Sequence, residues 1–141
     1  MKRLHDPRYV FLLNVAQRRI QRHIERLAEH RAGVSAVQAG ALFALSRQDG
    51  ALSGDLAAAL DIAPSAMTGL ADRMIKAGLI LRRTDQQDKR INRLWLTALG
   101  RETALAAKAE LAALNAVVTE GFSEAEMSTV SRWLEAMGKR F

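Results

Sequence analysis

The stretch from residue 61 to residue 97 constrains the fold of this chain more than any other, because it joins a helix with a polar face to a basic hairpin. A helix is predicted over 64–77, since proline is favoured in the first turn of a helix and a glycine follows its last turn. Two short segments, 80–84 and 91–96, come next and are separated by a charged loop. Apolar and polar residues alternate in the second segment, as they do in a strand that buries one face. The predicted order is therefore helix, strand, charged loop and strand.

A shorter helix is predicted immediately before this one. Ser53 is expected to cap a helix over 55–60, and the three residues 61–63 then form the turn into the next helix. Two helices joined by such a turn, followed by a hairpin, make up a winged helix-turn-helix. In this arrangement one element can enter each groove of duplex DNA. The fold class predicted is mainly α, with the helix-turn-helix at about 53–77 and the wing at about 80–97.

Four further helices are predicted outside this pair. Apolar residues recur along them at steps of three and four, which places these residues on one face of each helix. Ser35, Thr97 and Ser123 have the residue type and the position of helix caps. The predicted helices cover 7–31, 35 to about 49, 98–118 and 123 to about 140.

The first and the last two of these helices carry more apolar surface than a small DNA-reading module needs. Segments 7–31 and 98–140 are therefore predicted to be dimerisation helices that flank a DNA-binding module at 35–97, all within a single domain of residues 1–141. Aromatic side chains in these segments would anchor a partner chain. The alternative is that this surface only completes the core of a monomer. The aromatic residues are Tyr9, Phe11, Phe122, Trp133 and Phe141.

The charge and composition of the chain narrow the classes of partner and compartment. The 21 lysines and arginines exceed the 15 acidic residues, which gives a formal net charge of +6 and a sequence pI near 10.5. Such a balance suits a polyanionic partner, although charge alone does not separate DNA, RNA and an anionic membrane. The absence of cysteine excludes disulfides and thiolate zinc sites. There is no signal-peptide pattern and no apolar run of roughly 20 residues, so a cytoplasmic protein without membrane association is expected.

The predicted helix 64–77 has an outward face suited to DNA. Its inner face should be occupied by Met67, Leu70 and Met74. The outward face then begins with short hydroxyls and ends with cations. Hydroxyls and the free amides of a helix N-terminus bind phosphates and base edges, while arginine pairs with guanine. A solvated helix would look similar, and the position after a helix and a short turn favours the DNA-reading interpretation. The outward residues predicted are Ser65, Thr68, Gly69, Asp72, Arg73 and Lys76.

The hairpin concentrates positive charge on a thin projecting element. Guanidinium groups on such a projection suit the minor groove, where the negative potential is deepest over A-tracts. Asp88 is expected to brace Arg90 or to cap the turn, because a carboxylate that faced phosphate would repel it. The alternative is a surface hairpin whose charges only keep it soluble and unpaired. The charged residues are Arg82, Arg83, Lys89, Arg90 and Arg93, against Asp85 and Asp88.

Two motifs link these elements to a known family. The first lies in the wing and fits D-x-R followed by hydrophobic-x-L-T-x-x-G; its residues are Asp88-Lys89-Arg90, Leu94-Trp95-Leu96-Thr97 and Gly100. The second covers the helix before the wing and its exit; its residues are Ser65, Thr68, Leu70, Asp72-Arg73-Met74 and Gly78-Leu79-Ile80. With six predicted helices and one hairpin in the family's order, the chain resembles the MarR family of bacterial transcriptional regulators over essentially its whole length.

The resemblance implies a homodimer whose terminal helices interlock and whose two recognition helices enter successive major grooves of a pseudo-palindromic operator. Ser65, Thr68 and Arg73 match family positions that touch DNA. Arg90 matches the wing arginine that reaches the minor groove. Gly69 departs from the family pattern, because many members carry a side chain there on the DNA face, and close approach of the backbone to DNA would compensate. The DNA-binding residues predicted are Ser65, Thr68, Gly69, Arg73, Arg83, Lys89 and Arg90.

The resemblance also implies a small ligand. Relatives often release DNA when a phenolic or aromatic carboxylate binds between the dimerisation helices and the DNA-reading module. In this chain Arg18, Arg22 and Arg26 repeat at every fourth position of the first helix. Such a row of like charges is unfavourable unless Glu25 and Glu29, or a bound anion, offset it. Arg18 and Arg22 are therefore candidates for a ligand pocket, and a solvated, salt-bridged face is the alternative.

These features together predict a homodimeric, sequence-specific DNA-binding transcriptional regulator. In this family such a protein is most often a repressor, released from its operator by a small aromatic or phenolic anion. Two alternatives stay open. A non-specific nucleoid-type DNA-binding protein would keep a steep salt dependence without preferring one operator. A winged-helix adaptor for a protein partner would show neither property.

Catalysis and metal binding are not expected. The sequence has no nucleophile, base and orienting residue at a spacing typical of a catalytic site. It also has no glycine-rich phosphate loop. His23 and His30 lie two helical turns apart, which is too far for them to share one metal ion as neighbouring ligands. The sequence therefore predicts no enzyme activity, no cofactor and no metal site.

Overall fold

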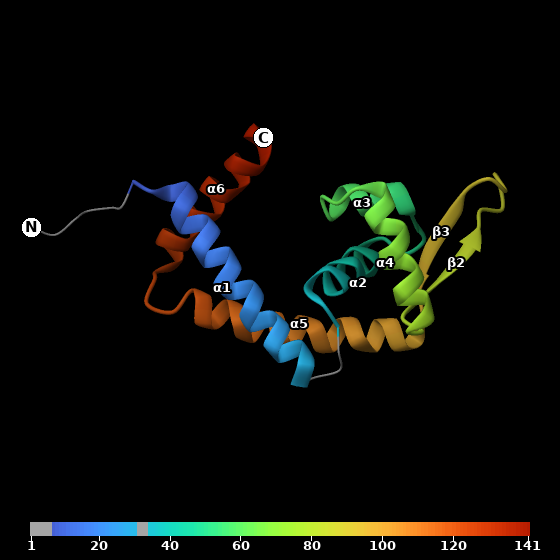
Figure 1. Cartoon of the computed structure of the whole chain (residues 1–141), viewed down its shortest axis with the longest axis horizontal. Coiled ribbons are helices and arrows are strands. Elements are labelled where there is room, and N and C mark those ends of the chain that lie inside the picture. Colours follow the sequence, from blue (N-terminus) through green and yellow to red (C-terminus); the bar gives the residue numbers. More distant parts are fainter. Residues whose placement is uncertain (1–6, 31–33) are drawn as a thin grey trace, which may run out of the picture. The chain divides into compact units, whose positions relative to one another are not determined.

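The computed structural model describes residues 7–30 and 34–141, with side chains for 7–27 and 34–141. This part of the chain is mainly helical with a small antiparallel sheet (Figure 1), which confirms the predicted fold class. Each predicted helix is present within a few residues of its expected bounds; residue 31, the expected end of the first, lies outside the described residues. The helices are α1 (Tyr9–His30), α2 (Ala36–Arg47), α3 (Ser53–Ala59), α4 (Pro64–Lys76), α5 (Ala98–Val118) and α6 (Glu124–Arg140). The strands are β1 (Ala51–Leu52), β2 (Ile80–Thr84) and β3 (Asn92–Leu96).

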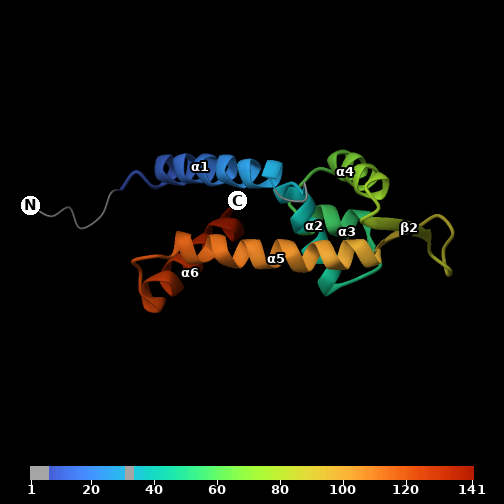
Figure 2. The same ribbon diagram turned by 90° about the horizontal axis from the view of Figure 1, so that it is seen from below.

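The described chain divides into two compact units. One ends at Ala107 and contains α1 to α4, the sheet and the first half of α5. The other, Lys108–Phe141, contains the rest of α5 and α6. The β2–β3 hairpin belongs to the first unit and extends beyond α2, α3 and α4 in both views (Figures 1 and 2). The helix-turn-helix and the wing are therefore parts of one compact unit.

Serine caps fix the starts of two helices as predicted. The hydroxyl of Ser35 accepts a hydrogen bond from the amide of Gln38 at 3.3 Å, and Gln38 Oε1 accepts one from the amide of Ser35 at 3.1 Å. Ser123 and Glu126 form the same reciprocal pair before α6, at 3.1 Å in both directions. The hydrogen bond from the backbone of Ser123 lowers the pKa of the Glu126 carboxyl. Both helices thus begin where a side chain satisfies amides that lack an intrahelical partner.

A third strand joins the hairpin and was not predicted. The sheet order is β1-β3-β2, and Ala51 and Leu52 of β1 pair with Leu94 and Arg93 of β3. Two residues are too few to show the alternation by which a strand is recognised in a sequence. The chain passes from this strand directly into α3, whose first residue is Ser53. The expected helix cap at Ser53 is therefore wrong, because Leu52 takes the cap position and offers no side-chain hydrogen bond.

The core of the first unit is formed by α2, α3, α4 and one face of the sheet. In the strand register Ile80 lies opposite Leu96 and Arg82 lies opposite Leu94, so these residues share the face toward the core. The predicted inner residues of α4 are buried, as are the alternating leucines of β3. Helix α4 and the wing therefore pack on a common apolar core. The largest buried side chains are Leu42, Leu45, Leu56, Met67, Leu70, Met74, Ile80 and Leu94.

The wing is anchored where β3 passes into α5. Thr97 Oγ1 accepts a hydrogen bond from the amide of Gly100 at 2.9 Å, as a helix cap does, and donates one to the carbonyl of Gly78 at 2.6 Å. The amide of Thr97 donates to the carbonyl of Leu79 at 3.1 Å. A Cβ atom on Gly100 would overlap this same carbonyl oxygen. Thr97 and Gly100 therefore join two parts of the backbone. Thr97 links the turn after α4 to the start of α5, and Gly100 permits the close approach of these two segments.

Apolar side chains remain exposed on the helices at the two ends of the described chain. Val10 on α1 is 74% exposed and Phe122, between α5 and α6, is 60% exposed. A single copy of the chain leaves these surfaces uncovered. Within the described residues, no helix is both long enough and apolar enough to cross a membrane. Further exposed apolar residues are Phe11, Leu105, Leu111, Val117, Leu134 and Phe141.

Candidate nucleic-acid interface

The outward face of α4 gathers the predicted contact residues of this helix. Ser65, Thr68 and Arg73 are exposed, and Gly69 between them is half-buried. Thr68 Oγ1 donates a hydrogen bond to the carbonyl of Pro64 at 3.2 Å. The hydroxyl proton of Thr68 is thereby engaged within the helix, and the oxygen keeps its lone pairs for a donor on a ligand. This face thus presents acceptors near its start and a guanidinium further along.

The N-terminus of α4 is open to an anion. Its N-cap residue, Ala63, makes no side-chain hydrogen bond, and Pro64 follows as the first helical residue. The first intrahelical hydrogen bond runs from the amide of Met67 to the carbonyl of Ala63 at 3.0 Å. The amides of Ser65 and Ala66 precede it and receive no cap from a described side chain. Uncapped amides and the positive end of the helix dipole together favour a phosphate at this position.

The tip of the wing is a tight turn organised by Asp88. The amide of Asp85 donates to the carbonyl of Ile91 at 2.8 Å, and the amide of Ile91 donates to the carbonyl of Asp88 at 3.0 Å. Asp88 Oδ1 accepts hydrogen bonds from the amide of Arg90 at 3.0 Å and from Arg90 Nε at 3.2 Å. The guanidinium also reaches Asp88 Oδ2 at 3.3 Å. Asp88 therefore holds both the backbone and the side chain of Arg90, whose side chain is nevertheless 90% exposed.

The hydrogen bonds from the Arg90 side chain, and then from its backbone, lower the pKa of the Asp88 carboxyl below its ordinary value of 3.8. A carboxyl whose pKa is lowered by folding contributes to stability above its ordinary pKa and loses that contribution as the pH falls through the lowered value. The contact between Asp88 and Arg90 is therefore complete at neutral pH. We expect no change of DNA affinity between about pH 5 and pH 8 from this pair, since Asp stays ionised throughout that range.

Replacement of Asp88 by asparagine tests this arrangement. We expect Asp88→Asn to lower the ratio of operator affinity to non-specific affinity by about 2- to 10-fold, because Arg90 must then be ordered on binding. Affinity for unrelated duplexes should stay level or rise, since one negative charge is removed near phosphate. Anisotropy titrations on both duplexes measure the ratio. An unchanged ratio would show that Asp88 does not position Arg90.

Besides Arg90, which pairs with Asp88, two of the five cations of the wing are engaged within the fold. Arg82 Nη2 lies 3.1 Å from Asp72 Oδ1 on α4. Arg93 Nη2 lies 3.6 Å from Asp85 Oδ2, and its Nη1 donates to the carbonyl of Gly50 at 3.0 Å. The pair of Arg82 and Asp72 was not predicted from the sequence, because the hairpin charges were considered without those of α4, to which Asp72 belongs. Arg83 and Lys89 are exposed and form no ion pair with a described side chain, and Arg90 stays exposed although it pairs with Asp88.

Asp49 fixes the base of the wing and was not singled out in the sequence. Its Oδ1 accepts hydrogen bonds from the amide of Leu96 at 2.9 Å and from the amide of Gly50 at 3.2 Å. Its Oδ2 lies 3.4 Å from Arg101 Nη2 in the first turn of α5. The only signal in the sequence is the pair Asp49-Gly50, typical of a turn. One carboxylate thus joins the loop after α2, the end of β3 and the start of α5.

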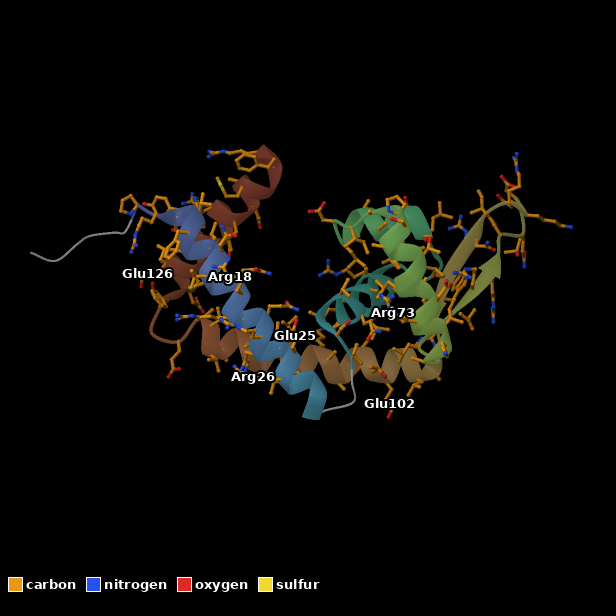
Figure 3. All side chains as sticks on the ribbon, viewed as in Figure 1. Arg18, Glu25, Arg26, Arg73, Glu102 and Glu126 are labelled. Carbon is orange, nitrogen blue, oxygen red and sulfur yellow. The ribbon has the colours of Figure 1, made fainter. Side chains whose placement is uncertain are left out.

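The candidate ligand residues Arg18 and Arg22 are exposed on α1. Figure 3 shows Arg18, Glu25 and Arg26 along this helix. Glu25 accepts a hydrogen bond from Gln21 Nε2 at 3.2 Å, and neither Arg18 nor Arg22 forms an ion pair with another described side chain. The role of these two arginines in a pocket stays a prediction. The side chains of Glu29 and His30 lie outside the described residues.

The site residues predicted from the sequence therefore fall into three groups of the first unit, which lie on α4, on the wing and on α1. Ser65, Thr68, Gly69 and Arg73 lie on α4, while Arg83, Lys89 and Arg90 lie on the wing. The ion pair between Asp72 and Arg82 joins these two elements. Their contacts with DNA stay predictions.

Comparison with known proteins places the chain among transcription regulators. A model of the MarR family matches residues 32–91. A MarR family transcription regulator of known crystal structure is 32% identical to the chain, over 94% of this chain and 87% of its own, with a TM-score of 0.82. None of the curated proteins is significantly similar to the chain.

Two more distant structures show the same fold. A probable transcriptional regulator from Pseudomonas aeruginosa is 23% identical, over 94% of this chain and 98% of its own, with a TM-score of 0.85. MepR of S. aureus, solved in a complex with DNA, is 22% identical, over 96% of this chain and 99% of its own, with a TM-score of 0.86. The family model, the regulator that is 32% identical and the winged helix-turn-helix agree, and the chain belongs to the MarR family of transcription regulators.

Proposed function

We propose that this protein binds duplex DNA as a homodimer and regulates transcription from a pseudo-palindromic operator. One observation supports this function best: the same compact unit presents two elements suited to DNA. The start of α4 is uncapped and bears hydroxyl groups, and at the wing tip the Arg90 side chain is 90% exposed. Membership in a family of transcription regulators supports it as well. A relative with the same fold, MepR, has been solved bound to DNA.

In the proposed complex α4 enters the major groove and the wing follows the adjacent minor groove. The uncapped amides at the start of α4 bind a phosphate, which sets the position of the helix. Thr68 and Arg73 contact base edges, because they lie exposed on the outward face. Arg90 enters the minor groove, while Arg83 and Lys89 neutralise phosphates on either side.

The homodimer is supported by the apolar surface at the ends of the chain. Tyr9, Phe11 and Val10 of α1 are 47%, 54% and 74% exposed, and Leu134 of α6 is 47% exposed. Large apolar and aromatic side chains are enriched in the buried centres of interfaces between subunits. A second copy of the chain would cover these residues, and it would also supply the second recognition helix that a two-fold operator requires.

Titration of DNA at several salt concentrations tests the function. The duplex upstream of the protein's own gene and a scrambled duplex of equal length are compared by fluorescence anisotropy. We expect tight binding to the first duplex, a preference of about 1,000-fold or more over the second, and a steep loss of affinity with salt. Equal, salt-dependent affinity for both would indicate non-specific binding, and no affinity for either would indicate a protein-binding adaptor.

We further propose that the protein acts as a repressor and that a small aromatic or phenolic anion releases it from DNA. The exposed arginines of α1, which form no ion pair with a described side chain, support an anionic ligand. A ligand releases DNA only if it binds the DNA-free arrangement of the dimer more tightly.

Replacement of Arg22 by alanine tests the ligand proposal. An aromatic acid such as salicylate should release wild-type protein from its operator at lower concentration than it releases Arg22→Ala, by about 10-fold if one charge-assisted hydrogen bond is lost. DNA affinity without ligand should be the same for both proteins. The matched control is Arg132→Ala, an exposed arginine of α6. If Arg22→Ala leaves every ligand response unchanged, Arg22 is not part of the pocket.

A further inference from the structure

The outward face of α4 contains one position without a side chain. Gly69 lies one residue after Thr68 and is half-buried, although its neighbours on this face are exposed. Glycine lowers the stability of a helix interior relative to alanine, and nothing in the backbone of α4 requires it, since Gly69 does not have a positive φ. Its presence on a DNA-facing surface therefore needs a reason outside the conformation of the helix.

The guanidinium of Arg73 fills the space beside Gly69. A Cβ atom at Gly69 would lie 3.3 Å from Arg73 Nη1. Long side chains in a helix lie back over the preceding turn, so residue 73 covers the surface above residue 69. Figure 3 labels Arg73 on α4. In this chain the guanidinium thus takes the place that a side chain at residue 69 would otherwise occupy, one turn closer to the start of the helix.

The charge of Arg73 is not neutralised by the neighbouring acid. Asp72, the adjacent residue, is paired with Arg82 of β2 at 3.1 Å. Arg73 forms no ion pair with any side chain that the structure describes. The donors of its guanidinium are therefore available to a ligand, and Arg73 lies exposed on the same helix as Thr68.

We infer that Gly69 and Arg73 act as one base-reading unit. The missing side chain at Gly69 lets the guanidinium of Arg73 lie against the helix, from where it donates two hydrogen bonds to O6 and N7 of a guanine in the major groove. Arg73 determines specificity in this unit, and Gly69 positions it. The inference rests on the proposed function, because it requires α4 to lie in the major groove.

A double-mutant cycle tests whether Gly69 positions Arg73. The alternative is that Gly69 allows the helix backbone to approach DNA closely. The proteins are wild type, Gly69→Ala, Arg73→Ala and the double variant. Each is titrated with the operator obtained by selection from random duplexes and with operators in which single G·C pairs are exchanged. Gly138→Ala is the matched control, because Gly138 lies exposed on α6 with nothing within 4 Å of an added Cβ. Thermal melting of every variant reports whether it folds.

We expect Arg73→Ala to reduce the preference for one particular G·C pair in each half-site by about 5- to 150-fold, the range for a lost bidentate contact. Gly69→Ala should reduce the preference at this same pair by several-fold, while it melts at or above the wild-type temperature. In the Arg73→Ala background, Gly69→Ala should have no further effect. Gly138→Ala should keep the wild-type preference.

Each of the following results would overturn the inference. An equal effect of Gly69→Ala in both backgrounds would mean that the glycine serves backbone approach. An effect of Gly69→Ala at a different base pair, or no effect in either background, would separate the two residues. If the wild-type protein selects no duplex at all, the proposed function fails, and the inference fails with it. If the wild-type protein does select an operator but Gly69→Ala changes no base preference, only the inference is overturned.

Discussion

Replacement of Gly100 by alanine is expected to destabilise the protein by about 3 kcal/mol and to lower its melting temperature by roughly 10 °C. A Cβ at this position would overlap the carbonyl oxygen of Leu79 and would lie 3.3 Å from Leu96 Cδ2. The carbonyl cannot simply move, because it accepts a hydrogen bond from the amide of Thr97 at 3.1 Å. Relief of the overlap must therefore break the junction between the wing and α5.

The measurement is thermal unfolding at fixed protein concentration, since the proposed dimerisation would make the midpoint depend on concentration. Gly54→Ala is the matched control. Gly54 lies exposed in α3, and an added Cβ there meets nothing within 4 Å. The control should melt at the wild-type temperature or slightly above it, because alanine is the better helix former. If Gly100→Ala melts like wild type, the junction does not have the close packing described.

Replacement of Arg90 by alanine is expected to weaken operator binding about 100-fold. One arginine that contacts a groove contributes about 1–3 kcal/mol, and a dimer loses two of them. Because the Arg90 side chain is 90% exposed, its removal should leave the fold and the melting temperature unchanged. The salt slope of binding should also become shallower by about 2, since the proposed dimer loses two cations that release counterions when they bind DNA.

Lys89→Ala is the control for Arg90→Ala, because it removes one cation from the same loop. We expect it to weaken binding to the operator and to unrelated duplexes by a similar factor, so that specificity is kept. Arg90→Ala should lower the affinity for the operator more than that for other duplexes. Equal affinity of wild type and Arg90→Ala in anisotropy titrations would remove the wing from the mechanism.

Most of the fold could be predicted from the sequence, because long helices show their period and their caps. Ser35 and Ser123 were recognised as caps from their residue type and their position before apolar helical patterns, and the structure adds a capping box to each. The inner face of α4 followed from the spacing of Met67, Leu70 and Met74, all of which are buried. These features depend on residues that are close together in the chain.

The features that were missed depend on contacts between distant segments. The strand Ala51–Leu52 is defined by its pairing with β3. Because this strand ends at Leu52, α3 begins at Ser53, earlier than predicted. The pair of Asp72 and Arg82 spans two elements, so the charge balance of the wing alone could not reveal it. The sequence could identify Gly69 as a departure from its family, but not that Arg73 fills the space beside it.

Selection of binding sites from a pool of random duplexes, with purified protein at physiological salt, tests the central claim most directly. Two copies of the chain that present paired α4 helices to one side of DNA should select a motif with two-fold symmetry and half-sites about one helical turn apart. A motif without two-fold symmetry, or no enrichment of any sequence, would contradict this account.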